Sequence, residues 1–103
     1  NDAMAFGALS ALRDAGVAVP EEMALAGFDD VSSARYTIPP LTTAHVPISE
    51  LGERAVAMLA ESVGAGSSRP RRRETLAATM VVRRSCGCDG AGGGIRAPRN
   101  EGR

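Results

Sequence analysis

The chain has 103 residues, of which 44% are hydrophobic and only 3% aromatic, and its formal net charge is zero. A chain of this length forms one small domain at most, and its core must be built from aliphatic side chains. No apolar run approaches the ~18 residues that a membrane-spanning helix needs, so we expect no contact with a membrane.

The charged residues are unevenly distributed along the chain. Residues 1–68 hold three Arg and nine acidic residues, whereas residues 69–103 hold nine Arg and three acidic residues. The densest basic run, Arg-Pro-Arg-Arg-Arg at residues 69–73, could contact phosphate groups. No aromatic residue interrupts this run, so a solvated loop is the favoured interpretation.

Residues 1–15 predict a helix. Apolar residues recur three and four positions apart, which places them on one stripe of a helix. The stripe contains Met4, Ala8, Leu9, Leu12 and Ala15. Asn1 or Asp2 can cap the amino end, and Gly16 can adopt the left-handed conformation that ends a helix.

A short apolar run at residues 23–28 predicts a buried strand that ends abruptly in two carboxylates, Asp29 and Asp30. In open α/β sheets, ligands bind outside the carboxyl ends of the strands. Asp29 is therefore the first candidate for binding a small molecule. The alternative is that one of the two carboxylates caps a short helix expected over residues 32–35.

The pattern of helix and strand continues after the two carboxylates. Residues 41–46 predict a second short strand, and Pro47 suits the first position of a helix that runs to about Val63. Residues 74–85 predict a last strand. Residues 87–103 are rich in Gly and Arg and poor in apolar side chains, so we expect them to be disordered.

Catalytic and metal-binding motifs are weak. His45 is the only histidine, and no nucleophile motif accompanies it, so we predict no enzymatic activity. Cys86 and Cys88 with one distant histidine provide too few ligands for a structural zinc site. We expect two reduced thiols, and neither a metal nor another cofactor.

Short motifs follow one another through the first 86 residues. They are Asn1-Asp2-x-Met4-Ala5-x-Gly7-Ala8, Ala15-Gly16-Val17-x-Val19-Pro20-Glu21, Gly27-Phe28-Asp29-Asp30, Pro40-Leu41-Thr42-Thr43, Leu51-Gly52-Glu53-x-Ala55 and Val82-Arg83-Arg84-Ser85. In this order the chain resembles the effector-binding domain of LacI/GalR-family bacterial transcription repressors. The resemblance covers the carboxyl-terminal third of such a protein, so the helix-turn-helix headpiece and most of the effector domain are expected upstream.

The resemblance implies an α/β fold, a fragment of a type I periplasmic-binding-protein-like domain in which parallel sheet strands alternate with helices. Two lobes would surround a ligand cleft. Residues 1–45 would belong to the carboxyl-terminal lobe, and residues 46–75 would form a hinge crossing and a helix of the amino-terminal lobe. Residues 76–86 would return to the carboxyl-terminal lobe, ahead of the tail at 87–103. The sheet that covers the helix after Pro47 would lie outside this chain, which would leave its apolar stripe exposed.

The resemblance also implies which residues face the cleft. Asn1 and Asp29 would bind hydroxyl groups or ring nitrogens of an effector, since a carboxylate accepts hydrogen bonds and an amide both donates and accepts them. Phe28 could add an apolar face to the cleft. The favoured alternative for Phe28 is a place in the core.

Two further sets of residues follow from the resemblance. The hinge crossings would fall at His45-Val46-Pro47 and at Glu74-Thr75. The surface where carboxyl-terminal lobes pair in family dimers would contain Ser32, Ser33, Arg35 and Tyr36. The alternative for this second set is an ordinary half-exposed loop.

Two functional classes fit these expectations. The favoured one is the sensor part of a cytoplasmic, ligand-controlled repressor, a homodimer or higher homo-oligomer that binds a sugar or related metabolite. It would contact operator DNA only through a domain absent from this chain. The alternative is part of a periplasmic solute-binding protein of a sugar transporter, in which two nearby cysteines would be a liability.

Overall fold

The computed structural model describes residues 1–65 and 72–88, and these form two compact units. Unit 1 contains residues 1–46 and the described residues from Ala78 onward, and unit 2 contains the described residues between Pro47 and Ala77. The predicted tail beyond Cys88 and residues 66–71, which include most of the basic run, lie outside the described residues.

Unit 1 begins with helix α1, Asp2–Asp14, as the sequence predicts. Asn1 caps it, because its side-chain oxygen accepts a hydrogen bond from the Met4 amide at 3.0 Å. Gly16, with φ of 73°, ends it by donating its amide hydrogen to the Arg13 carbonyl.

The predicted apolar stripe of α1 is confirmed at Leu9, which is buried, and wrong at Met4 and Ala15, which are exposed. The buried residues are Asp2, Ala5 and Leu9, whereas Met4 is 74% exposed. The helix is turned about its axis so that the Asp2 carboxylate reaches polar groups of the sheet, and this rotation carries Met4 into solvent.

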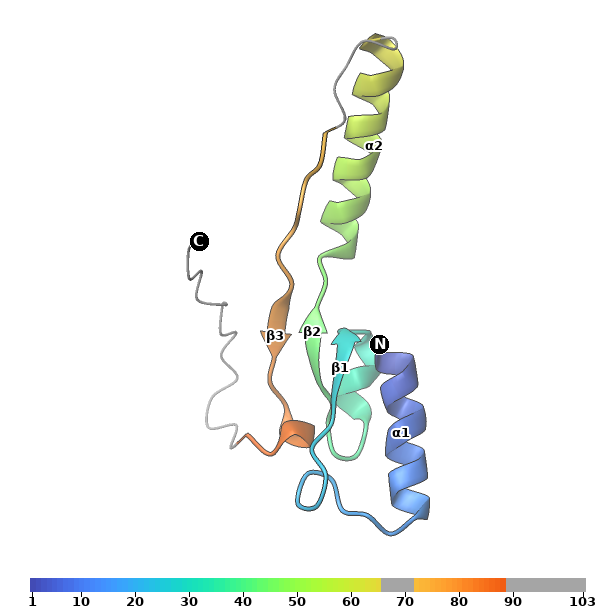
Figure 1. Ribbon diagram of the computed structural model, residues 1–103, viewed down its shortest axis with the longest axis vertical. Helices are drawn as coiled ribbons and strands as arrows, with labels where there is room; N and C mark the ends of the chain where they lie inside the picture. Colours follow the sequence, from blue (N-terminus) through green and yellow to red (C-terminus); the bar gives the residue numbers. More distant parts are fainter. Residues whose placement is uncertain (66–71, 89–103) are drawn as a thin grey trace. The chain divides into compact units, whose positions relative to one another are not determined.

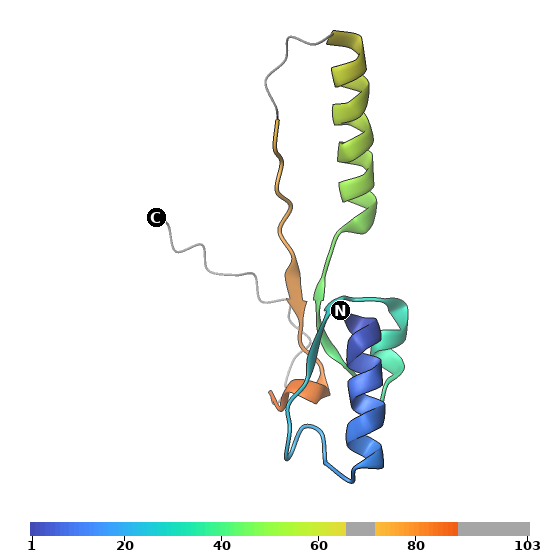
Figure 2. The ribbon, with the colours of Figure 1, turned by 45° about the vertical axis from the view of Figure 1, so that its right-hand side comes forward.

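Three short strands form a mixed sheet in the order β1-β2-β3 (Figures 1 and 2). Strand β1, Ala26–Asp29, pairs in parallel with β2, Thr42–His45, so the two predicted strands are confirmed. Strand β3, Thr79–Val81, runs antiparallel to β2. The expectation of a buried β1 is wrong: its residues alternate between exposed and half-buried. Within the described residues β1 pairs only with β2, so one of its edges stays open.

The apolar core of unit 1 is small and aliphatic. It is formed by Ala5, Leu9, Ala34 and Leu41. Ala34 belongs to a 3-10 helix, η1, Ser32–Tyr36, which confirms the helical turn predicted there. A core with so few methylene groups provides little hydrophobic stabilisation, so unit 1 depends on hydrogen bonds between its buried polar groups.

Ser85 supplies several of these hydrogen bonds from a second 3-10 helix, η3, Arg84–Cys86. Its fully buried hydroxyl donates to the Leu25 carbonyl at 2.7 Å and accepts from the Thr42 amide at 2.8 Å. The Leu25 amide donates in turn to the Ser85 carbonyl at 2.8 Å. Ser85 thus joins the beginnings of β1 and β2, from 60 positions beyond Leu25 and 43 positions beyond Thr42.

Unit 2 contains helix α2, Ile48–Ala65, close to its predicted bounds. Its apolar residues Ile48, Leu51 and Leu59 are all exposed, as expected for a stripe without its covering sheet. Glu74 forms ion pairs with Arg54 at 3.1 Å and Arg72 at 2.7 Å. The described end of the basic run is therefore partly neutralised. Neither described α-helix is long and apolar enough to cross a membrane.

Candidate ligand-binding site

Asp29 is the last residue of β1, beside His45 in the parallel register. Its backbone has φ of 117°, and the next residue, Asp30, has φ of 54°. Both angles lie in the left-handed region, which costs a non-glycine residue on the order of 1–3 kcal/mol and is concentrated at functional sites. The half-buried Asp29 carboxylate forms no hydrogen bond or ion pair with residues 1–65 or 72–88. A strained turn therefore holds an available carboxylate at the carboxyl end of a strand.

Asp2 holds this turn in place through hydrogen bonds. Its carboxylate is fully buried; Oδ1 accepts from the Thr43 hydroxyl at 2.6 Å and Oδ2 accepts from the Val31 amide at 2.9 Å. The Asp30 amide donates to the same Thr43 hydroxyl at 3.3 Å. The two backbone amides that follow Asp29 are therefore both held by the Asp2–Thr43 pair.

Gly27 leaves the space that the Asp2 carboxylate occupies. A β-carbon at this position would overlap Asp2 Oδ1 and would lie 3.0 Å from a methyl group of Leu41. The absence of a side chain at Gly27 is thus a condition for burying the Asp2 carboxylate next to β1.

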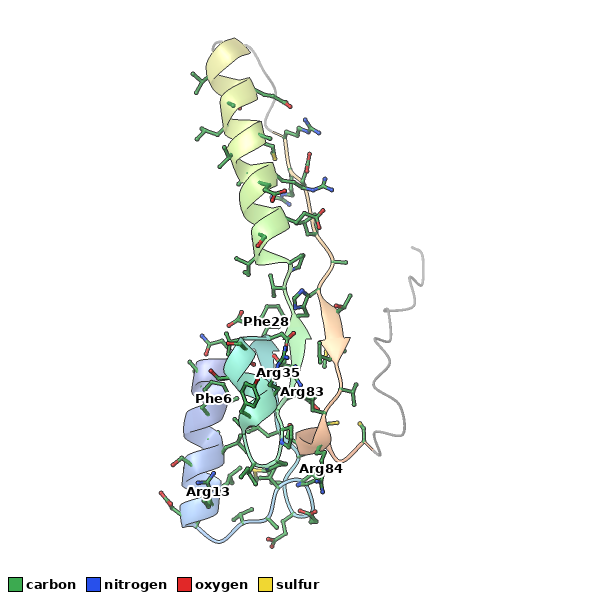
Figure 3. All side chains as sticks on the ribbon, turned by 180° about the vertical axis from the view of Figure 1, so that it is seen from behind. Phe6, Arg13, Phe28, Arg35, Arg83 and Arg84 are labelled. Carbon is green, nitrogen blue, oxygen red and sulfur yellow. The ribbon has the colours of Figure 1, made fainter. Side chains whose placement is uncertain are left out.

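The Asp30 carboxylate is bound by two other side chains. Its Oδ1 accepts from Arg83 Nη2 at 2.7 Å, and its Oδ2 lies 3.1 Å from His45 Nδ1. Arg83, labelled in Figure 3, also donates to the Leu41 carbonyl at 2.8 Å. The predicted alternative, in which Asp29 or Asp30 caps η1, is wrong. The N-cap residue of η1 is Val31, whose side chain makes no capping hydrogen bond, and the Val31 amide is bound by Asp2.

The partners of Asp30 change its acidity. Burial raises the pKa of Asp30, but hydrogen bonds from Arg83 and His45 and their charges outweigh it and hold the pKa below its ordinary value of 3.8. A lowered pKa in the folded state means that Asp30 stabilises the fold fully above about pH 4. That contribution is lost as the pH falls through the lower, folded-state pKa.

We therefore expect Asp30→Asn to reduce the stability of unit 1 at pH 6, and the difference from the unchanged chain to shrink as the pH falls below about 4. Urea unfolding followed by circular dichroism between pH 6 and pH 2 measures this difference. Asp14→Asn, at the exposed end of α1, is the control and should change stability little at any pH. A pH-independent effect of Asp30→Asn would contradict the assignment.

The other predicted cleft residues lie near Asp29. The first turn of α1 and the end of β1 lie side by side in both ribbon views (Figures 1 and 2). The Asn1 side-chain oxygen is used by the helix cap, and its amide group is exposed. Phe28, labelled in Figure 3, is 49% exposed, so the favoured expectation that it belongs to the core is wrong for this structure.

The predicted hinge residues lie at or near the border of the two units. Unit 1 ends at Val46 and unit 2 begins at Pro47, so the boundary falls within the predicted crossing at residues 45–47. The chain re-enters unit 1 at Ala78, three residues beyond Thr75. Glu74 is held inside unit 2 by its ion pairs. A hinge role for these residues stays a prediction.

The predicted dimer surface falls on η1. Its members Ser32, Ser33, Arg35 and Tyr36 are all exposed, and Tyr36 is 78% exposed. Only Ala34, between them, faces the core. The structure leaves this surface open, and its role in pairing stays a prediction.

The sequence interpretation missed Asp2, Thr43 and Arg83 as parts of the site. Asp2 had a usable signal, since its spacing to Ala5 and Leu9 places it on the buried face of α1. Arg83 had none, because its partner Asp30 is 53 positions away in the sequence. Among the described residues, no group of three or more His, Cys, Asp or Glu side chains can hold a metal ion.

The chain is similar to proteins of a known family. Residues 1–86 match the family described as periplasmic binding protein-like domain. The chain is 40% identical over 88 residues to the HTH-type transcriptional repressor MelR of Bacillus subtilis, covering 85% of this chain and 25% of the relative. It therefore spans about a quarter of the length of the curated relatives it matches.

Solved structures show the same similarity. A putative LacI-family regulator from Sanguibacter keddieii is 44% identical with a TM-score of 0.78, over 84% of this chain and 32% of that one. A LacI-family regulator from Enterococcus faecalis, solved with bound ribose, is 33% identical with a TM-score of 0.75, over 82% of this chain and 32% of that one.

Proposed function

Because the chain belongs to the periplasmic binding protein-like domain family and matches part of the effector-binding domain of LacI-family regulators, we propose that it senses a small molecule for a DNA-binding transcriptional regulator. The observation that carries this proposal is the Asp29 carboxylate on its strained turn, which has no hydrogen bond or ion pair to residues 1–65 or 72–88. The proposed ligand is a sugar or a related polyhydroxylated metabolite.

The chemistry of the site suits such a ligand. The two oxygens of Asp29 can accept hydrogen bonds from neighbouring hydroxyl groups, and the exposed Asn1 amide can donate one. The exposed ring of Phe28 offers an apolar surface to the carbon face of a sugar. Asp2 and Thr43 fix the turn before the ligand arrives, which lowers the entropy lost on binding.

In this proposal, ligand binding changes the relative position of two lobes. Residues 45–47 and 74–75 serve as hinge crossings, and binding changes the closure of the lobes on either side. The exposed η1 surface pairs with a second copy, and DNA is bound by a separate domain. The coupling free energy between two allosteric sites is typically about 1–3 kcal/mol. The protein acts in the cytoplasm as a binder rather than an enzyme.

The alternative, part of a periplasmic solute-binding protein, is less well supported. The curated relatives are named as HTH-type transcriptional repressors and regulators, and the matching solved structures include LacI-family regulators. Cys86 and Cys88 form no disulfide bond, which suits a reducing compartment better than an oxidising one.

A chimera tests the proposed function directly. In this ribose chimera, residues 1–86 replace the matching segment of the Enterococcus faecalis regulator, which supplies the rest of the cleft. We expect it to bind ribose, and Asp29→Ala to weaken binding roughly ten- to hundredfold, because a charged hydrogen-bonding group contributes about 1.5–3 kcal/mol. Isothermal titration calorimetry measures the affinity.

Asp14→Ala in the same chimera is the matched control, since Asp14 is an exposed aspartate at the far end of α1. Its ribose affinity should equal that of the unchanged chimera. Circular dichroism checks that each variant is folded. A folded Asp29→Ala variant with undiminished ribose affinity would remove Asp29 from the binding site.

A further inference from the structure

Two cysteines that are not joined by a disulfide bond lie two positions apart at the end of η3. Cys86 and Cys88 are separated by Gly87, whose φ of 70° turns the chain back in a left-handed conformation. This turn brings the Cys88 amide to 3.3 Å from the Cys86 sulfur. The Cys86 thiol also donates to the Arg83 carbonyl at 3.5 Å.

The fold holds this thiol pair in place. Cys86 follows the buried Ser85, whose backbone and hydroxyl bind Leu25 and Thr42. Cys86 is half-buried, whereas Cys88 is exposed, so one thiol is fixed by the fold and the other meets solvent.

The surroundings of Cys86 also favour its reactive form. Burial raises the pKa of the Cys86 thiol, but hydrogen bonds from the side chains of Thr42 and Cys88 and from backbone amides outweigh it and hold the pKa below its ordinary value of 9.0. The thiolate is the nucleophile in thiol–disulfide exchange, so Cys86 is the attacking member of the pair.

We propose that Cys86-Gly87-Cys88 is a redox-active thiol pair that small disulfides such as oxidised glutathione convert to an intramolecular disulfide. The Cys86 thiolate attacks one sulfur of the small disulfide, breaks its S–S bond and releases one thiolate, which leaves a mixed disulfide on Cys86. The Cys88 thiolate, having given its proton to solvent, then attacks the Cys86 sulfur and releases the second small thiolate. The two cysteines lose two electrons, and the small disulfide is reduced to two thiols.

The full 103-residue chain is suited to a test, because these are its only two cysteines. The chain is incubated with oxidised glutathione, quenched with acid and weighed by mass spectrometry. We expect a monomer lighter by two hydrogen atoms that no longer reacts with maleimide. Cys88→Ser should instead stop at a stable glutathione adduct on Cys86, because the resolving thiol is missing.

A second measurement tests whether the fold makes Cys86 more reactive than an ordinary thiol. At pH 7 the adduct should form on Cys86 in the Cys88→Ser chain more than about threefold faster in buffer than in denaturing urea. Cys88 in the Cys86→Ser chain should show no such difference. The proposal is overturned by covalent dimers or persistent glutathione adducts of the unchanged chain, and equally by a Cys86 rate that is the same in urea.

Discussion

Asp2→Ala is expected to destabilise unit 1 by about 3–6 kcal/mol, because each hydrogen bond to a buried charged group contributes about 1.5–3 kcal/mol and Asp2 accepts two. The substitution leaves the Thr43 hydroxyl without its acceptor and the Val31 amide without its partner. The turn that carries Asp29 then loses its support, so ligand affinity should fall together with stability.

The ribose chimera allows both quantities to be measured on one protein. Urea unfolding gives the free energy of unfolding, and calorimetry gives the affinity for ribose in whatever fraction remains folded. Asp14→Ala, the same substitution at the other end of α1, should change stability by less than about 0.5 kcal/mol. A loss of less than 1 kcal/mol for Asp2→Ala would mean that the buried carboxylate does not hold the turn.

Gly27→Ala is the second substitution with a large expected effect. The new methyl group would overlap Asp2 Oδ1 and press on Leu41, and such overpacking costs about 1–3 kcal/mol. The matched control is Gly7→Ala in α1, where a β-carbon meets no atom within 4 Å. That substitution should stabilise the helix by about 0.5–1 kcal/mol.

The two substitutions can also be combined, because the main obstacle at Gly27 is the Asp2 carboxylate. In a chain that already carries Asp2→Ala, adding Gly27→Ala should cost much less than it costs alone, and urea unfolding of the four variants gives this coupling energy. If the two losses of stability were additive, the methyl group at position 27 would clash with something other than Asp2.

Local sequence patterns were sufficient for the elements themselves. An Asn before a helical apolar run and a Gly after it set the ends of α1, since capping depends on atoms within four residues. Alternation of short apolar runs with turns located β1, β2 and α2 in the same way. The position of Asp29 at a strand end also followed from the chain alone, because it needs no information about distant residues.

The partners of each side chain were decided by the tertiary structure. The parallel register of β1 and β2 puts Gly27 beside Thr43, and only that pairing lets Asp2 reach a hydroxyl 41 positions away. The return of residues 83–85 to the sheet separates the two neighbouring carboxylates: Asp30 is bound by Arg83, and Asp29 is left available. Two aspartates that are equivalent in sequence thus take different roles, because hydrogen bonding acts over about 3 Å and responds to strand register rather than to distance along the chain.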